Sequence, residues 1–391
     1  MLTRVRNSNI ELLRIIAMLM IIAHHHVIHN VTDVCSLSSP VVSDFYLCLQ
    51  VLGKIGVVIF FLISAWYLCD EKMTNIKKNY LRIFTLEKQL FFYSIALSSG
   101  TLLIHHFVKS FPSLSTSLAI KSVIPVWGEI WWYCTAYVAF LLFCPFVTRS
   151  LVMIGQRLHF YLVLLLTVTW GVIYGLTPLT YLGVLGDSFV FFIILYSFVA
   201  YIKWYGLVPN ERQSWILAIF GCSVLIACII CGGILKKVTG IGLFEKIQVG
   251  FAGSGKLPVI LAALGIFFIA INKKHLWHNK IVNSIAASTL AVYLIHEYPT
   301  IRMFLACQFD IGKLTVSSWA PLVSIGIVLG IFVVCTAIDY VRRFLFKFVL
   351  DRHPGKYANK IWSFTTQMVA SSRVWMKLTK DIDEPSQELR A

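Results

Sequence analysis

Long runs of apolar residues follow one another along most of this chain, separated by short polar segments. Ten of the runs are about 20 residues long, the length that an α-helix needs to cross a bilayer. They lie near 9–30, 46–69, 86–108, 129–148, 158–177, 187–206, 214–235, 249–272, 281–300 and 317–346. We therefore predict an all-α, polytopic membrane bundle of about ten transmembrane helices within residues 1–350.

The composition excludes a soluble globular protein. Hydrophobic residues make up 58% of the 391 residues, charged residues make up only 13%, and the mean hydropathy is +0.79. A water-soluble domain of this size could not hide so much apolar surface.

The formal net charge of +16 follows the predicted topology. If the N-terminus is inside, the predicted cytoplasmic segments hold 24 Lys and Arg residues and the opposite loops hold 7. Lys and Arg accumulate on the cytoplasmic side of membrane proteins. We expect a multi-pass protein of the inner, cytoplasmic membrane with both termini in the cytoplasm, and no nucleic-acid partner.

Residues 351–391 are predicted to form a cytoplasmic tail. Its segment 357–380 places apolar side chains among basic ones, which suits an amphipathic helix lying on membrane lipid; these side chains are Ile361, Trp362, Phe364, Met368, Val369 and Trp375. The polar end, DIDEPSQELRA, is expected to be disordered.

The first apolar run carries an unusual stripe of ionisable residues. Arg14 and His25 are eleven positions apart, so on a helix they share one face and lie about 16 Å apart along the axis. Glu11 and His29 each fall about 60° round from Arg14. Ionisable groups inside a bilayer are costly and usually functional. The alternative is a structural polar seam between helices.

His25 is the candidate general base, because a neutral imidazole in an apolar site can accept a proton near pH 7. His24 and His26 point about 100° away from it on either side. His25 and His29 have the i, i+4 spacing of two metal ligands, but the sequence offers no third ligand at a telling distance. We therefore expect no metal site.

Arg14 lies near the cytoplasmic end of its helix, where its guanidinium can hold a phosphate or carboxylate through two hydrogen bonds. Lys78 and Arg82 have i, i+4 spacing in the second cytoplasmic segment and would share a helix face. An anion site at Arg14, with the candidate base three helical turns deeper in the membrane, suits a long substrate such as a CoA thioester. The alternatives are a snorkelling arginine and an ordinary positive-inside loop.

Several motifs in order resemble the membrane acyltransferase 3 family over nearly the whole chain. The family's first span has an arginine, ten residues and a histidine, as in Arg14 and His25. Its second span has a glycine, a Phe-Phe pair and a serine, here in GVVIFFLISAWYL at 56–68. WWYCTAYVAFLLFCPF at 131–146 and STLAVYLIHEYP at 288–299 resemble two later spans. Two departures are Ala65, where a glycine usually follows the serine, and RIFTL, which lacks the usual proline.

The resemblance implies an enzyme that moves an acyl group, usually acetyl, from cytoplasmic acyl-CoA to a sugar hydroxyl of a cell-surface polysaccharide or lipid-linked precursor. It implies a stand-alone member without an esterase-like soluble domain, and acyl-CoA as a co-substrate with no bound cofactor. His25 would be catalytic, with Glu11 orienting Arg14 or merely offsetting its burial.

In the same reading, Arg14, Lys78 and Arg82 would hold the CoA phosphates. His296 and Trp132 would contact the acceptor, although a packing histidine and an interfacial aromatic belt are the alternatives. The rival function is a non-enzymatic glycan exporter or flippase, in which the polar stripe would line a path.

Overall fold

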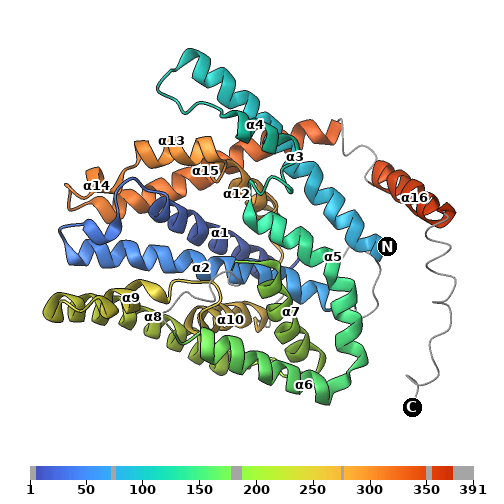
Figure 1. The fold of residues 1–391 in the computed structure, drawn as a ribbon, viewed down its shortest axis with the longest axis horizontal. Coiled ribbons are helices and arrows are strands. Elements are labelled where there is room, and N and C mark those ends of the chain that lie inside the picture. Colours follow the sequence, from blue (N-terminus) through green and yellow to red (C-terminus); the bar gives the residue numbers. More distant parts are fainter. Residues whose placement is uncertain (1–5, 72–75, 178–186, 274–276, 349–354, 373–391) are drawn as a thin grey trace.

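The computed structural model describes residues 6–71, 76–177, 187–273, 277–348 and 355–372. Within these ranges the chain is all-helical and contains no strand (Figure 1). The all-α class predicted from the apolar pattern is therefore confirmed. The tail end predicted to be disordered, 381–391, lies outside the described residues.

Seven helical segments in the described part are long and apolar enough to cross a membrane. Each coincides with one of the ten predicted runs. They are α1 (Ser8–Ile28), α2 (Pro40–Leu68), α3 (Ile76–Phe107), α5 (Trp132–Met153), α6 (Gly155–Leu166) continued by the π-helical segment η2 (Thr167–Tyr174), α8 (Glu211–Thr239) and α15 (Ala320–Phe348).

The other three predicted runs coincide with shorter apolar helices. These are α7 (Phe189–Trp204), α10 (Leu257–Ile271), and the pair α11 (Lys280–Ala286) and α12 (Thr289–His296). The structure thus supports seven spans by length and composition, and the total of about ten stays a prediction.

Short helices connect the long ones. They are the 3₁₀ turn η1 (Val34–Ser36), α4 (Thr116–Val123), α9 (Gly242–Gly250), α13 (Pro299–Gln308) and α14 (Ile311–Leu314). The boundaries follow ordinary capping rules. Asn210 and Gln213 form a reciprocal capping box at the start of α8, and Gly240 ends it in the left-handed conformation at φ 69°.

The centre of the bundle is the contact between α1 and α2, which run side by side (Figure 1). Two glycines of α2 allow this close approach. A Cβ atom at Gly53 would lie 2.0 Å from His24 Cβ, and one at Gly56 would lie 2.6 Å from the Ala17 carbonyl oxygen. Small residues let membrane helices pack backbone against backbone. The contact fixes the rotation of α1 and hence the direction in which its polar stripe faces.

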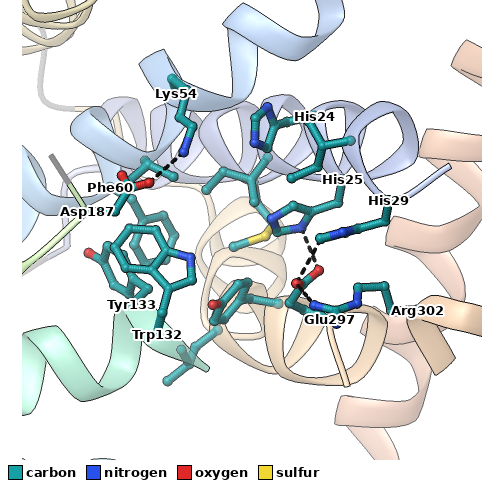
Figure 2. Close-up of a pocket in the computed structure, with 16 residues that line it drawn as sticks. His24, His25, His29, Lys54, Phe60, Trp132, Tyr133, Asp187, Glu297 and Arg302 are labelled. Carbon is teal, nitrogen blue, oxygen red and sulfur yellow. Dashed lines mark hydrogen bonds and ion pairs between the residues drawn. The ribbon is translucent and has the colours of Figure 1, made fainter. Parts of the chain in front are cut away.

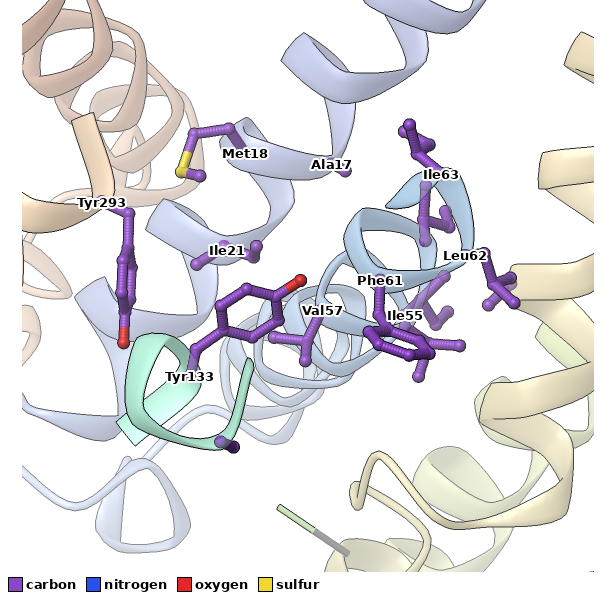
Figure 3. Close-up of a cluster of buried hydrophobic side chains, with 14 of the residues drawn as sticks. Ala17, Met18, Ile21, Ile55, Val57, Phe61, Leu62, Ile63, Tyr133 and Tyr293 are labelled. Carbon is purple, nitrogen blue, oxygen red and sulfur yellow. The ribbon is translucent and has the colours of Figure 1, made fainter. Parts of the chain in front are cut away.

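Buried apolar side chains surround this contact (Figure 3). Ala17 of α1 and Phe61 of α2 are fully buried, and Tyr133 of α5 and Tyr293 of α12 close the cluster from the other side. Elsewhere the outer faces of α8 and α15 expose large apolar side chains, for example Phe220 and Val333. Such faces suit contact with lipid.

The helix α16 (Lys356–Ser371) falls within the predicted amphipathic segment. Its Trp362 ring lies 5.0 Å from the Tyr80 ring of α3, centroid to centroid, while Phe364 and Met368 are exposed. An amphipathic helix therefore forms where the sequence predicted one. Its placement on the membrane surface stays a prediction, and Trp375 lies outside the described residues.

Candidate active site

A pocket of about 250 Å³ lies between α1, α2, α5 and α12 (Figure 2). His25 and Trp132, both singled out in the sequence, face each other across it. The described residues that line it are Met18, Ile21, His24, His25, Ile28, His29, Lys54, Val57, Phe60, Trp132, Tyr133, Asp187, Leu290, Tyr293, Glu297 and Arg302.

The three consecutive histidines of α1 point in three directions, as helical phase predicts. His24 Nδ1 lies 2.5 Å from the Gln50 carbonyl oxygen of α2, and His26 Nε2 lies 3.3 Å from the Ser324 hydroxyl of α15. His25 instead turns toward the end of α12. His25 is therefore the member of the run that combines a place in the pocket with contacts to other ionisable side chains.

His25 Nδ1 lies 2.9 Å from His296 Nε2 and 3.1 Å from Glu297 Oε2. His296 Nδ1 in turn lies 2.6 Å from the Val292 carbonyl oxygen. A carbonyl only accepts hydrogen bonds, so His296 Nδ1 donates, and in the neutral ring His296 Nε2 then accepts. His25 Nδ1 therefore carries a proton, which leaves the lone pair on His25 Nε2. That nitrogen faces the pocket (Figure 2).

His296 is buried behind His25 and is not part of the wall of this pocket. Its contact with the acceptor stays a prediction. In the structure its ring contacts His25 Nδ1, where it holds the ring and tautomer of His25.

Glu297 is a functional candidate that the sequence reasoning missed. Its Oε1 accepts hydrogen bonds from His29 Nε2 at 3.0 Å and from Arg302 at 2.8 Å, and its Oε2 faces His25. The carboxylate is almost fully buried. It lies beside His296 in YLIHEYP, and a carboxylate in an apolar run is itself a signal of function.

The second contact that sequence reasoning missed is an ion pair on the opposite wall of the pocket. Lys54 of α2 reaches Asp187 Oδ2 at 2.7 Å, and the Ser254 hydroxyl donates to Asp187 Oδ1 at 2.8 Å. Lys54 could have been noticed as a cation in the middle of an apolar run, but nothing in the sequence pairs it with Asp187.

His25, His29 and Glu297 bring three potential ligand atoms within 4.8 Å of one another. Two histidines and a carboxylate could hold a metal ion such as zinc. The third ligand that the sequence did not reveal is thus Glu297. However, His25 Nδ1 could coordinate a metal only through a lone pair. In the hydrogen-bond network described above, that nitrogen carries a proton instead. The absence of a metal remains our expectation.

A second pocket, of about 280 Å³, lies at the Arg14 end of α1. Arg14 lines it, and an Arg14 guanidinium nitrogen lies 3.4 Å from Glu11 Oε2. Glu11 is buried there, about 21 Å along the helix from His25. Phe60, Tyr133 and Leu290 line both pockets. These three side chains therefore belong to the walls of both pockets.

Lys78 and Arg82 share one face of α3, as their spacing predicts, and both bind Glu71. Arg82 holds that carboxylate with two nitrogens, at 2.6 and 3.0 Å, and Lys78 contacts it as well. Burial raises the pKa of Glu71, but hydrogen bonds from Arg82 and Lys78 outweigh burial and leave the pKa below its ordinary value. A carboxylate thus occupies the cationic site that the sequence assigned to phosphate.

A family model described as an acyltransferase domain, that of the acyltransferase 3 family, matches residues 7–340. Comparisons with the curated proteins and with the solved structures give no match. The matched range contains every candidate residue named above, the whole lining of the His25 pocket, and all of the second pocket's lining except Arg6. Because the match covers most of the chain, this protein belongs to the acyltransferase 3 family of membrane acyltransferases.

Proposed function

We propose that the protein moves an acyl group, with acetyl as the expected case, from cytoplasmic acyl-CoA to a sugar hydroxyl of a cell-surface polysaccharide or lipid-linked precursor. One observation carries this proposal: the hydrogen bonds of His296 to Val292 and His25 leave the lone pair of His25 facing a pocket, and this pocket shares wall residues with a second pocket beside Arg14. A base and an anion site at opposite ends of one path suit a long donor.

The chemistry follows from the proton positions. His25 Nε2 takes the proton of the acceptor hydroxyl as its oxygen attacks the thioester carbonyl carbon. A C–O bond forms, the C–S bond breaks, and the proton passes from His25 to the departing sulfur, which gives an ester and free CoA. Glu297 Oε2, 3.1 Å from Nδ1, stabilises the imidazolium that exists during transfer.

The donor would enter from the cytoplasm. Arg14 binds a CoA phosphate through its planar fork, and Glu11 orients Arg14. Lys78 and Arg82 supply further cationic contacts once the donor displaces Glu71. The pantetheine arm then passes Phe60 and Tyr133 into the His25 pocket. Acyl-CoA acts as a co-substrate, and no bound cofactor takes part.

The acceptor would bind in the His25 pocket. Trp132 offers an aromatic face, while His296 acts through His25. A volume near 250 Å³ lies below the usual range of about 300–1,000 Å³ for drug-sized ligands. The site therefore suits one sugar ring at a time rather than a chain of rings.

Labelled acetyl-CoA distinguishes this function from glycan export. Inverted membrane vesicles that contain the protein should transfer label to the surface glycan or its lipid-linked precursor, in a form that mild alkali releases as acetate. Vesicles without the protein should not. Glycan that reaches the far side without label, in the presence of the protein, would favour the exporter and contradict an acetyltransferase.

A further inference from the structure

We propose that the acceptor ring is an uncharged sugar, held through its hydroxyls by the Lys54–Asp187 pair. This inference rests on the proposed function and names the substrate class of the same pocket. Lys54 and Asp187 lie across the pocket from His25 and beside Trp132 (Figure 2).

The pair is rigid and still open to a ligand. Lys54 Nζ and the Ser254 hydroxyl each bind one oxygen of Asp187, so the carboxylate is fixed from two elements. The Lys54 side chain is 17% exposed and that of Asp187 is 41% exposed. Both therefore retain hydrogen-bonding capacity toward the pocket.

The donor and acceptor groups of this pair match a hydroxyl-bearing ring. An ammonium group offers three donors, and each carboxylate oxygen has two lone pairs. A sugar hydroxyl both donates and accepts, so neighbouring hydroxyls can bind lysine and aspartate together. Trp132 adds an aromatic face, and ligand pockets typically combine such surfaces with a few placed polar groups.

The acidic and basic side chains of the pocket wall are paired with one another. Among its described residues, Lys54 pairs with Asp187, Glu297 contacts both Arg302 and His29, and His25 is neutral in the hydrogen-bond arrangement described above. The neighbouring segment 178–186, outside the described residues, has no Asp, Glu, Lys, Arg or His in its sequence. An anionic ring would need a cation that is not already paired. The pocket therefore favours a neutral ring over a uronic acid.

Sugar binding by the purified full-length protein tests this inference without requiring acyl transfer. The probes are methyl glucoside, methyl galactoside and methyl N-acetylglucosaminide, with methyl glucuronide and methyl galacturonide as anionic counterparts, titrated by calorimetry. At least one neutral glycoside should bind about tenfold or more tightly than either uronide, the scale of one charge-assisted contact. Equal or tighter uronide binding, or no binding of any probe, would overturn the inference.

Substitutions give a sharper readout than loss of binding. Asp187→Asn should weaken binding of the neutral glycoside. By releasing the Lys54 ammonium it should also tighten binding of the uronide, so the ratio of the two affinities changes by about tenfold. Lys54→Met should weaken both. Unchanged selectivity in Asp187→Asn would show that the Lys54–Asp187 pair only stabilises the position of α2 and does not bind the sugar.

The matched control is Lys203→Met, because the Lys203–Asp70 pair has nearly the same exposure, 16% and 34%, and does not line the pocket. It should leave sugar binding unchanged.

The double variant Lys54→Met/Asp187→Leu leaves no unpaired buried charge and should fold. It should still lose the sugar, whereas retained binding would contradict the inference. Sugar binding with the expected selectivity but no acyl transfer would refute only the proposed function.

Discussion

At the scale of single residues, the proposed role of His25 as a base depends on which of its two ring nitrogens carries a proton. The Val292 carbonyl fixes the tautomer of His296, and His296 fixes that of His25. Glu297 adds a negative charge beside the protonated nitrogen. These contacts suit His25 to the proposed role of a base that faces the pocket and whose cation is stabilised.

Glu297→Gln tests the charge next to His25. The amide keeps the size of the side chain but cannot stabilise the imidazolium, so turnover should fall by about 10²-fold or more. The binding of acyl-CoA should change little, because Glu297 lies in the other pocket. Initial rates and donor affinity are measured on the purified variant. Glu245→Gln, which removes an ion-paired carboxylate on α9, is the control. A normal rate in Glu297→Gln would contradict its role.

Glu71→Gln tests whether the carboxylate competes with the donor for Lys78 and Arg82. Removing its charge should tighten CoA binding about two- to fivefold, the size of a partly exposed ion pair. Asp70→Asn removes a neighbouring carboxylate that pairs with Lys203, and it should not tighten binding. Weaker CoA binding in Glu71→Gln would mean that the pair supports the site rather than competing for it.

Single residues also show how far sequence reasoning reaches in this site. Arg14 and His25 could be chosen because helical phase relates residues on one helix. Glu297, Asp187 and Glu71 could not be assigned partners, because their contacts join separate elements and depend on how those elements pack. His296 was found in the sequence, but its contact with His25 required the fold.

At the scale of elements, two features place the proposed catalytic groups. The glycines of α2 bring α1 close enough to fix its rotation. The second feature is the interruption of the ninth predicted span. Pro299 lacks a backbone N–H and starts the new helix α13, so α12 ends at His296. The break leaves Glu297 at a helix end, where its side chain reaches His25, His29 and Arg302.

Apolar length predicted where helices lie but not where they break. The runs at 187–206, 249–272 and 281–300 contain helices shorter than predicted. The Ser188 side chain caps α7, Pro258 lies in the first turn of α10, and Pro299 begins α13. Capping hydrogen bonds and prolines set such boundaries, and mean hydropathy does not report them.

Gly56→Ala tests the contact between α1 and α2. The added methyl group would meet the Ala17 carbonyl at 2.6 Å, so the helices must separate, at a cost of about 1–3 kcal/mol. Thermal unfolding of the detergent-purified protein should occur at a lower temperature. Gly100→Ala on α3 is the matched control, since nothing lies within 4 Å of its new Cβ. Wild-type stability of Gly56→Ala would contradict the close packing described here.

At the scale of the whole molecule, the two pockets share wall residues and together form the proposed path from a donor end to an acceptor end. Their shared wall residues come from α2, α5 and α12, which no local sequence window relates. The orientation of this path depends on the topology. If the Arg14 end faces the cytoplasm, acyl-CoA has direct access to it and the acceptor approaches from the opposite side.

Reporter fusions test that orientation. A reporter after Ser38, between α1 and α2, should be external, and one after Ala391 should be cytoplasmic, because Lys and Arg concentrate on the predicted inner side. An external C-terminus would mean that one of the predicted spans does not cross the membrane. The shorter helices would be the first to re-examine.

The most direct test of the central claim is acyl transfer by His25→Ala. Membranes with the wild type, His25→Ala or His26→Ala are supplied with labelled acetyl-CoA, and the label on the surface glycan or its precursor is measured. His26 is the next residue along α1, and its ring contacts the Ser324 hydroxyl rather than His296 and Glu297. The account predicts that His25→Ala loses about 10²–10⁴-fold in rate while it remains folded and binds CoA, and that His26→Ala stays active. Wild-type transfer by His25→Ala would contradict the assignment of His25 as the base.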